Sequence, residues 1–351
     1  MKKFNVIGLM SGTSLDGLDI VYVNFKHDKS WKYEIINSKT YKYEKKWNSL
    51  LQNISKEKIK SVIKIDTDYT KLLSKYIIKF INEFSIKDID FISSHGHTAL
   101  HQPSRSLTYQ IGNLPILAKY IKQKVVCDFR VQDVELGGQG APLVPVGEQY
   151  LFSEYNMLIN LGGFANITKR IKKDITAYDI CPINIVFNHL ARIIELKYDD
   201  GGYIASTGDM NQDLYNNLQS LDYYKQDPPK SLGIEWVNDQ IYPILKDFKD
   251  VPIEDLMNTF SNHFAFQIVK NIGDQDKVLI TGGGAYNEYL IGKIKNLTNS
   301  KITIPDPKII EYKEALIFAF LGLLRVLKIN NCYSSVTGAK KDHCSGKIYN
   351  P

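Results

Sequence analysis

The chain has 351 residues and a formal net charge of +6, from 44 Lys and Arg against 38 Asp and Glu. Its positive charge comes from scattered lysines, without a dense Arg block or interleaved aromatic residues, which argues against a nucleic-acid partner. A chain of this length buries roughly three quarters of its unfolded surface, so we expect two lobes, each with its own core, and an active-site cleft between them.

Targeting and membrane segments are not expected. The amino terminus, MKKFNVIGLMSG, holds only a short apolar run, too short for the core of a signal peptide. No window approaches the about 20 apolar residues of a membrane helix. The four cysteines form no CxxC pair, which argues against a zinc knuckle and a disulfide framework. We therefore expect a cytoplasmic protein without a membrane partner.

The predicted elements of the first part alternate between strands and helices. FNVIGLM and LDIVYVNF flank the polar SGTSLDG and predict a hairpin. A helix follows in DTDYTKLLSKYIIKFINEF, then a buried strand in DFISS, a helix over 114–122 and a strand in VVCDF. The glycine-rich VELGGQGAPLVPVG then changes the composition sharply. We place lobe I at 1–130, joined by the tail 331–351, and lobe II at 131–330.

The second part repeats the opening pattern. NMLINLGG and FANITKRI again form a strand, a glycine turn and a strand. A helix is expected over 253–272, followed by the strand KVLITGGG and a helix from Tyr286. EALIFAFLGLLRVL predicts a buried core helix. The order of elements indicates an α/β protein with two similar halves.

Three glycine-rich turns follow apolar strands, at 10–17, 162–166 and 282–284. Nucleotide phosphates need several backbone N–H donors at close range, and glycine leaves room for them. In the first turn Thr13 and Ser14 offer hydroxyls, and Asp16 is a candidate to hold Mg²⁺ through water. Each turn alone fits an ordinary hairpin, but the three together favour ATP binding. None is a GxxxxGK[ST] loop or a Rossmann GxGxxG.

Longer motifs carry a resemblance to a known family. GLMSGTSLDGLD, SSHGHTALHQP, DFRVQDVELGGQGAPLVP, NLGGFANIT, TGGGAYN and EALIFAF are similar to those of anhydro-N-acetylmuramic acid kinases. The resemblance implies a two-lobed, actin-like ATPase (ribonuclease H-like) fold, and homodimers. It also implies that ATP and Mg²⁺ are used to hydrolyse the 1,6-anhydro bridge of the sugar while O6 is phosphorylated, in cell-wall recycling.

The resemblance also assigns residues. It places the phosphates against the first two turns and the adenosine against the third. The residues of these turns and motifs are Gly12, Thr13, Ser14, Leu15, Asp16, Gly17, Leu18, Asp19, Gly162, Gly163, Asn166, Gly282, Gly283, Gly284 and Asn287. The family's catalytic aspartate corresponds to Asp179 in AYDICPIN, which we expect to deprotonate water. From the residues alone, Asp179 could equally cap a helix that begins at Pro182. Cys181 and Ile183 stand where the family motif has glycines, while Asn184 is retained.

Several polar residues are candidates for the sugar site. His95 and His97 follow the strand DFISS and can hydrogen-bond a sugar; we prefer this to a metal cluster with His101, and His97 replaces a glutamine of the family motif. The guanidinium of Arg130 would suit a lactyl carboxylate. Asp128 and Asp133 are either further contacts or local ion-pair partners of Arg130. Glu314 is either another polar contact or an exposed charge at a helix amino terminus.

Two other functions remain open on the sequence. Phosphate loops identify a nucleotide better than an acceptor, so a kinase of another small sugar on the same fold is one alternative. The altered DICPIN motif keeps this alternative alive. A non-catalytic ATP-binding sensor is the other, and it would be favoured only if Asp16 or Asp179 were missing.

Overall fold

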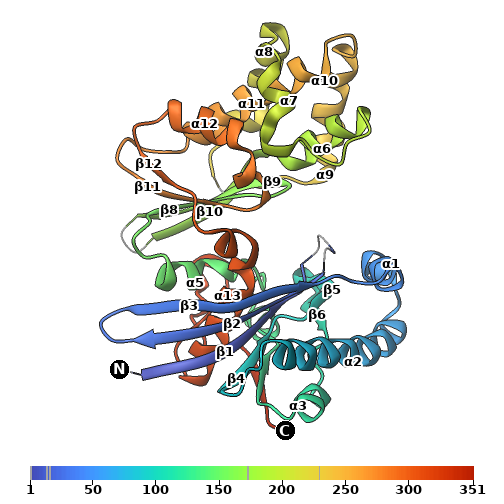
Figure 1. Ribbon diagram of the computed structural model, residues 1–351, viewed down its shortest axis with the longest axis vertical. Coiled ribbons are helices and arrows are strands. Elements are labelled where there is room, and N and C mark those ends of the chain that lie inside the picture. Colours follow the sequence, from blue (N-terminus) through green and yellow to red (C-terminus); the bar gives the residue numbers. More distant parts are fainter. Residues whose placement is uncertain (1, 13–14, 16, 172–173, 229) are drawn as a thin grey trace. The chain divides into compact units, whose positions relative to one another are not determined.

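The computed structural model describes the chain apart from residues 1, 13, 14, 16, 172, 173 and 229 (Figure 1). It divides into two compact units: unit 1 comprises Met1–Ser153 and Tyr312–Pro351, and unit 2 comprises Glu154–Glu311. The divisions predicted from the sequence lie at residues 130 and 330 instead. The glycine-rich segment after Arg130 lies in unit 1 because its groups bond there: the buried Glu148 accepts a hydrogen bond from Lys313 Nζ at 2.9 Å.

Unit 1 is built on a six-stranded sheet in the order β13-β7-β4-β1-β2-β3. β1, β2 and β3 form an antiparallel meander, while β4 is parallel to β1, and β7 is parallel to β4. A separate two-stranded sheet joins β5 and β6. The strands are β1 (Lys2–Met10), β2 (Leu18–His27), β3 (Trp31–Tyr41), β4 (Phe91–Ser94), β5 (His97–Gln102), β6 (Leu107–Ile111), β7 (Val125–Cys127) and β13 (Lys347–Tyr349).

Helices cover both faces of the unit 1 sheet. Ile7 and Leu9 face a core shared with α2 (Ile59–Glu83) and α3 (Ile116–Ile121). Gly8 faces α13 (Pro307–Val326), where an added Cβ would lie 2.3 Å from the carbonyl oxygen of Ala315. Glycine at this position therefore allows a close helix–strand contact. The remaining α-helices are α1 (Lys45–Asn53), α4 (Val131–Glu135), α5 (Val144–Leu151) and α14 (Ser334–Thr337).

Unit 2 is built on a five-stranded sheet in the order β10-β9-β8-β11-β12. Its strands are β8 (Met157–Leu161), β9 (Phe164–Ile171), β10 (Asp174–Pro182), β11 (Lys277–Thr281) and β12 (Lys301–Thr303). One sheet face packs into an apolar core with several of its helices. These and the other α-helices of the unit are α6 (Asn184–Ile193), α7 (Tyr203–Thr207), α8 (Gln212–Ser220), α9 (Ile234–Trp236), α10 (Tyr242–Asp247), α11 (Ile253–Val269) and α12 (Glu288–Asn296).

The two sheets repeat one topology. In unit 2, β8, β9 and β10 form an antiparallel meander, β11 is parallel to β8, and β12 is parallel to β11. Read from the meander, β3-β2-β1-β4-β7 in unit 1 corresponds to β10-β9-β8-β11-β12 in unit 2. This repeat confirms the predicted α/β class with two similar halves, and is the arrangement expected of an actin-like fold.

The main predicted elements are confirmed, with shifted ends. Both glycine-turn hairpins, the long α2 and the buried α13 form where the sequence periodicity places them. One local prediction is wrong: β10 runs on to Pro182, and α6 begins only at Asn184 with Ile183 as its N-cap. Among the described residues, no helix combines the length and the apolar character needed to span a membrane.

Candidate active site

The first glycine turn joins β1 to β2 in unit 1. Three of its predicted ligands, Thr13, Ser14 and Asp16, lie outside the described residues. Of the others, Leu15 packs against the unit 1 core, and an added Cβ on Gly17 would lie 2.6 Å from the carbonyl oxygen of Tyr41. The first turn is therefore held close against β3. Two predicted ligands follow the turn on β2: Leu18 is buried, and Asp19 accepts a hydrogen bond from Thr40. Gly12 lies between β1 and the part of the turn outside the described residues.

A chain of buried polar groups connects the first turn to β5. Ser11 Oγ lies 2.9 Å from His97 Nδ1 and 2.7 Å from the hydroxyl of Tyr43, which lies 2.6 Å from the hydroxyl of Tyr69. Burial lowers the pKa of His97 to about 4, so its ring is neutral near pH 7. His97 thus positions the start of the first turn.

In unit 2 a row of polar side chains crosses the sheet. Asp179 on β10 pairs with Asn166 on β9, Asn166 pairs with Asn160 on β8, and Asn160 pairs with Thr281 on β11. Directly opposed residues on neighbouring strands share a sheet face. Asn160 and Thr281 are not among the predicted site residues. Their signal is a polar residue in an otherwise apolar strand, as in MLINL and KVLIT.

Asp179 lies at an irregularity of β10, where the pairing with β9 shifts between Asp179 and Cys181. Its Oδ2 accepts a hydrogen bond from the backbone N–H of Leu232 at 2.9 Å, and its backbone carbonyl accepts one from the Tyr223 hydroxyl at 2.6 Å. Burial raises the pKa of the Asp179 carboxyl, although the Leu232 N–H bond opposes this. Its carboxylate is a stronger base than an exposed one, and the α6 N-cap is Ile183 rather than Asp179.

The other two glycine turns meet in unit 2. The carbonyl of Gly163 accepts hydrogen bonds from Ile183 and Ile185, which ties its turn to the start of α6. Gly282 has a φ of +83°, and an added Cβ there would lie 2.7 Å from Asn160 Oδ1. Asn184 Nδ2 donates to the carbonyl oxygen of Leu161 at 3.1 Å. The predicted site residues that these contacts bring together are Gly162, Gly163, Asn184, Gly282, Gly283 and Gly284.

A hollow lies beside the third turn. It has a volume of about 380 Å³ and is lined in part by Ala285, Tyr286, Ile291 and Ile310. This volume falls within the range of small-molecule pockets, about 300–1,000 Å³. Nearby, Asn287 accepts a hydrogen bond from Leu290 N at 2.9 Å and so caps α12. The predicted nucleotide contact of Asn287 therefore competes with a structural role.

Two predicted sugar residues of unit 1 bond to each other. Arg130 Nε donates to His95 Nε2 at 2.9 Å, and Arg130 also donates to the carbonyl oxygen of Gly140 at 2.6 Å. Burial and the charge of Arg130 hold the pKa of His95 well below its usual range, so this ring is neutral. The guanidinium also lies 6.0 Å from the Phe318 ring centroid. Glu314 is exposed within α13, beyond its first turn, and its charge interacts with Arg130.

The two predicted aspartates have other partners. Asp128 pairs with Lys347 at 3.3 Å. Asp133 is fully buried, and its carboxylate accepts hydrogen bonds from Gly140 N and Thr337 Oγ1, each at 2.6 Å. The ion pairs found among the described residues do not join either aspartate to Arg130. These contacts favour structural roles over sugar binding, most clearly for Asp133.

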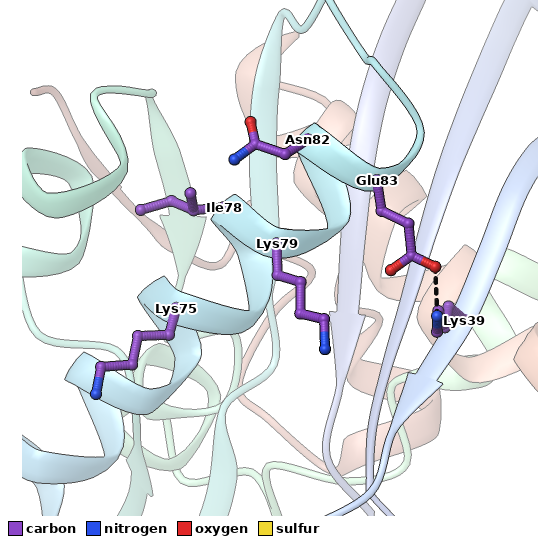
Figure 2. A pocket seen from close by; sticks show the side chains of 6 residues that line it. All are labelled: Lys39, Lys75, Ile78, Lys79, Asn82 and Glu83. Carbon is purple, nitrogen blue, oxygen red and sulfur yellow. Dashed lines mark hydrogen bonds and ion pairs between the residues drawn. The ribbon is translucent and has the colours of Figure 1, made fainter.

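A second, larger hollow lies over α2 and β3 (Figure 2). It is lined by Lys39, Lys75, Ile78, Lys79, Asn82 and Glu83, none of which is a predicted site residue. Lys39 forms an ion pair with Glu83, which links β3 to α2. The feature is a surface hollow with solvated charges rather than a candidate active site.

The chain is similar to known proteins over almost its whole length. A sequence profile described as anhydro-N-acetylmuramic acid kinase matches residues 4–351. Proteins of that name from Clostridioides difficile and Francisella tularensis subsp. novicida are 36% and 32% identical, and in each case 97% of both chains is covered. A solved structure, the activator of the 2-hydroxyisocaproyl-CoA dehydratase from Clostridium difficile with bound ADPNP, aligns with a TM-score of 0.44 and 16% identity, covering 94% of this chain and 99% of that one. The chain therefore belongs to the anhydro-N-acetylmuramic acid kinase family.

Proposed function

We propose that this protein phosphorylates 1,6-anhydro-N-acetylmuramic acid with ATP, opens the anhydro bridge with water, and yields N-acetylmuramic acid 6-phosphate for cell-wall recycling. Family membership over residues 4–351 supports the kinase activity. The observation that carries the mechanism is the position of Asp179, on the same polar row as Asn166, Asn160 and Thr281. Two of the predicted nucleotide-binding turns, at Gly162 and Gly282, adjoin that row.

Asp179 acts as the general base in this proposal. Its carboxylate takes a proton from water while the water oxygen bonds to C1 of the sugar. The C1–O6 bond breaks, O6 bonds to the γ-phosphorus of ATP, and ADP leaves. A positioned base contributes about 10² to 10⁴ in rate, while positioning and charge neutralisation supply much of the remainder. The raised pKa of the Asp179 carboxyl favours proton transfer to it.

The nucleotide contacts follow from the glycine turns. An added Cβ on Gly163 would meet nothing within 4 Å, so its backbone is open to a ligand. We assign the adenosine to the third turn and the hollow beside Tyr286, and the phosphates to the first two turns. Magnesium bound with ATP would neutralise phosphate charge. Asp16 is the residue proposed to hold it. The other carboxylate near the turn, that of Asp19 on β2, already accepts a hydrogen bond from Thr40.

The sugar contacts are assigned to His95, Arg130, Asn184 and Glu314. Arg130 suits the lactyl carboxylate because a guanidinium binds carboxylates through two parallel hydrogen bonds. Its bonds to His95 and Gly140 fix the orientation of the side chain. We assign His97 a positioning role, through Ser11, rather than direct sugar contact.

The competing function is phosphorylation of a different small sugar. Cys181 and Ile183 motivate it, because both replace glycines of the family motif. Both side chains are fully buried in the unit 2 core, and the Ile183 N–H still donates to the Gly163 carbonyl at 2.8 Å. The substitutions therefore fill the core and leave the backbone bond to the turn in place, which favours the family's own acceptor.

A panel of acceptors separates these two functions. ADP release is measured with anhydro-N-acetylmuramic acid, N-acetylmuramic acid, N-acetylglucosamine and glucose, each with ATP and Mg²⁺. We expect turnover with the anhydrosugar far above that with the others. Faster turnover with another sugar would establish the alternative. ADP release that no acceptor stimulates, with ATP still bound, would favour the sensor.

Three further properties accompany this proposal. We propose a Mg²⁺ requirement and a homodimer, which rest on the family resemblance, and a cytoplasmic location, which rests on the amino-terminal sequence and the cysteine pattern. Metal titration of the rate tests the first, fractionation of the producing cells the second, and sedimentation of the purified chain the third.

A further inference from the structure

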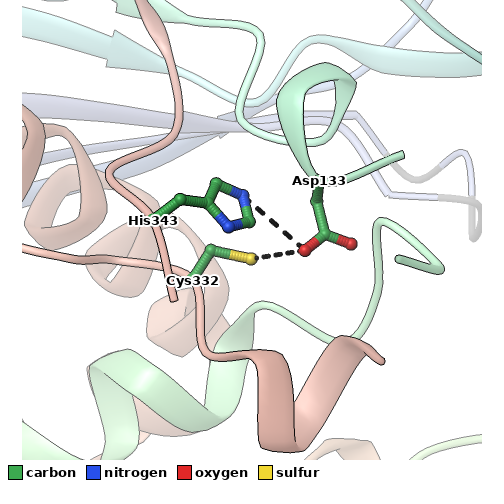
Figure 3. Close-up of side chains that lie close together, drawn as sticks. All are labelled: Asp133, Cys332 and His343. Atoms are coloured by element: carbon green, nitrogen blue, oxygen red, sulfur yellow. Dashed lines mark hydrogen bonds and ion pairs between the residues drawn. The ribbon is translucent and has the colours of Figure 1, made fainter. Parts of the chain in front are cut away.

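Three side chains with metal-binding atoms converge in unit 1, and none of the three is assigned a contact with the reactants. Asp133 and Cys332 are fully buried, and His343 is 4% exposed. Their ligand atoms all lie within 4.8 Å of one another. Figure 3 shows the thiol of Cys332 and the ring of His343 both directed at the same carboxylate oxygen of Asp133.

The imidazole of His343 supplies the second observation. Its Nδ1 lies 3.1 Å from the carbonyl oxygen of Lys341, which can only accept, so Nδ1 carries a hydrogen. In the neutral ring Nε2 is then a bare lone pair. This buried atom has no hydrogen-bond partner in the described part of the chain, and it faces Asp133 Oδ1 at 3.6 Å. Two acceptors that face each other in the protein interior need either a proton or a metal ion between them.

The arrangement around His343 is that of a metal ligand. A metal-bound histidine commonly donates its second ring N–H to a backbone carbonyl, as His343 does to Lys341. Cys332 Sγ lies 3.0 Å from Asp133 Oδ1. Zinc bonds to sulfur at about 2.3 Å and to nitrogen and oxygen at about 2.0–2.2 Å, so ligand atoms about 3–4 Å apart fit around one tetrahedral ion.

We propose that Asp133, Cys332 and His343 bind a structural Zn²⁺ ion. Zinc displaces the thiol hydrogen of Cys332, so the S–H bond breaks, a Zn–S bond forms, and one proton is released to solvent. The fourth ligand is the hydroxyl of Thr337, which already contacts Asp133 Oδ1, or a water molecule. One thiolate, one imidazole and one carboxylate form a donor set that suits zinc better than magnesium.

The ion would bind the carboxy-terminal tail to the segment after Arg130. Cys332 and His343 pair in an isolated antiparallel bridge of the tail, whereas Asp133 belongs to α4. Backbone bonds between Gln139 and Thr337 and between Lys340 and Leu136 already join the two segments. Zinc would therefore raise the stability of the folded protein without contacting the reactants.

Metal analysis tests the proposal on the full-length chain. The wild-type protein, purified without chelator, is expected to retain about one zinc ion per chain. When chelator-treated protein is reloaded with zinc, it is expected to release one proton per ion bound. Cys332→Ser and His343→Gln each remove a proposed ligand. Each is expected to weaken zinc binding by more than the roughly 10- to 100-fold that is lost when a residue hydrogen-bonded to a ligand is replaced. The matched control is Cys344→Ser, because the Cys344 thiol lies 3.9 Å from the Arg325 carbonyl and outside the cluster.

Cobalt gives a readout that does not depend on the variants folding. Chelator-treated wild-type protein reloaded with Co²⁺ is expected to show a thiolate-to-cobalt charge-transfer band, and Cys344→Ser should show the same band. Absence of both zinc retention and the cobalt band would overturn the proposal and leave a His343–Asp133 ion pair as the explanation. Binding by Cys332→Ser equal to that of the wild type would also overturn it. None of these readouts depends on kinase activity.

Discussion

Asp179 is the residue on which the proposed chemistry depends. Asp179→Asn keeps a side chain of the same shape, and its amide oxygen can still accept the Leu232 N–H bond, but it cannot take a proton. We expect the rate of sugar phosphorylation to fall by about 10² to 10⁴ while the affinity for a non-hydrolysable ATP analogue is unchanged. Steady-state kinetics and calorimetry measure the two quantities.

The exposed Asp222 provides the matched control for this variant. Its carboxylate pairs with Lys225 on the surface, so Asp222→Asn should retain full activity. In the wild type, the raised pKa of Asp179 should move the acidic limb of the rate profile to a higher pH than an exposed carboxyl would give, because the base acts when deprotonated. Normal turnover by Asp179→Asn would assign the base to another residue.

His97 links the first turn to the acid stability of unit 1. Its pKa is about 4 in the folded protein against 6.5 for the unperturbed group, so below pH 6.5 the unfolded state binds its proton first. Stability supplied by the neutral ring is therefore lost as the pH falls from about 6.5 to about 4, by about 3 kcal/mol in total. His97→Gln should lose correspondingly less stability between pH 7 and pH 4.

Urea unfolding at several pH values measures this difference. The exposed His27 provides the control, because His27→Gln should follow the wild-type pH dependence. Equal pH dependence in His97→Gln and the wild type would show that the ring is not held neutral by burial. His95 and His263 also have lowered pKa values, so part of the acid sensitivity should persist in His97→Gln.

At the scale of residues, the sequence predicts which residues belong to the site better than it predicts their hydrogen-bond partners. Asp179 and the glycines were found through motifs, because their chemistry restricts which residue can serve. The contacts of Asp133 with Cys332 and Thr337 were not predictable, since they join residues about 200 positions apart in the chain. Asn160 was missed because only strand pairing places it beside Asn166.

At the scale of elements, the glycine turns differ in why glycine is needed at each position. Gly282 has a positive φ and no room for a Cβ, whereas Gly163 is exposed and has room for one. Gly282→Ala should lower the free energy of unfolding by about 1–3 kcal/mol. Gly163→Ala should change it by less than about 0.5 kcal/mol, yet raise KM for ATP several-fold, because the added methyl group occupies the space assigned to phosphate.

Denaturant unfolding and ATP kinetics on the two variants check this contrast. Because each adds the same methyl group, each serves as the control for the other. An unchanged KM for ATP in Gly163→Ala would remove that turn from the phosphate site. Equal stability of the two variants would contradict the strain assigned to Gly282.

Element type was predictable where periodicity was strong. The apolar spacing of α2 identifies it from the sequence alone, and so does the apolar run of β8, which a glycine turn separates from β9. The end of β10 was not predictable, because Pro182 can begin a helix or end a strand, and strand pairing with Phe164 decides for the strand. The polar β5 and β6 carry a weak signal and were not predicted.

At the scale of the whole molecule, the repeated sheet topology explains why the sequence shows two similar halves. The predicted boundary at residue 130 followed a change of composition, whereas the structure divides after Ser153. Long-range bonds place the glycine-rich segment in unit 1, among them the bond between Lys313 and Glu148. A glycine-rich composition indicates a flexible or turn-rich segment, but it does not show which unit that segment packs against. The boundary could therefore not be predicted from the sequence.

The origin of the new hydroxyl oxygen in the product tests the central proposal most directly. Purified protein is incubated with ATP, Mg²⁺ and anhydro-N-acetylmuramic acid in ¹⁸O-labelled water, and the sugar product is analysed by mass spectrometry. The proposed mechanism predicts a product that carries both a phosphate group and a single solvent oxygen at C1. Asp179→Asn should form this product far more slowly than the wild type. A phosphorylated sugar that retains its anhydro bridge, or an unchanged sugar, would contradict it.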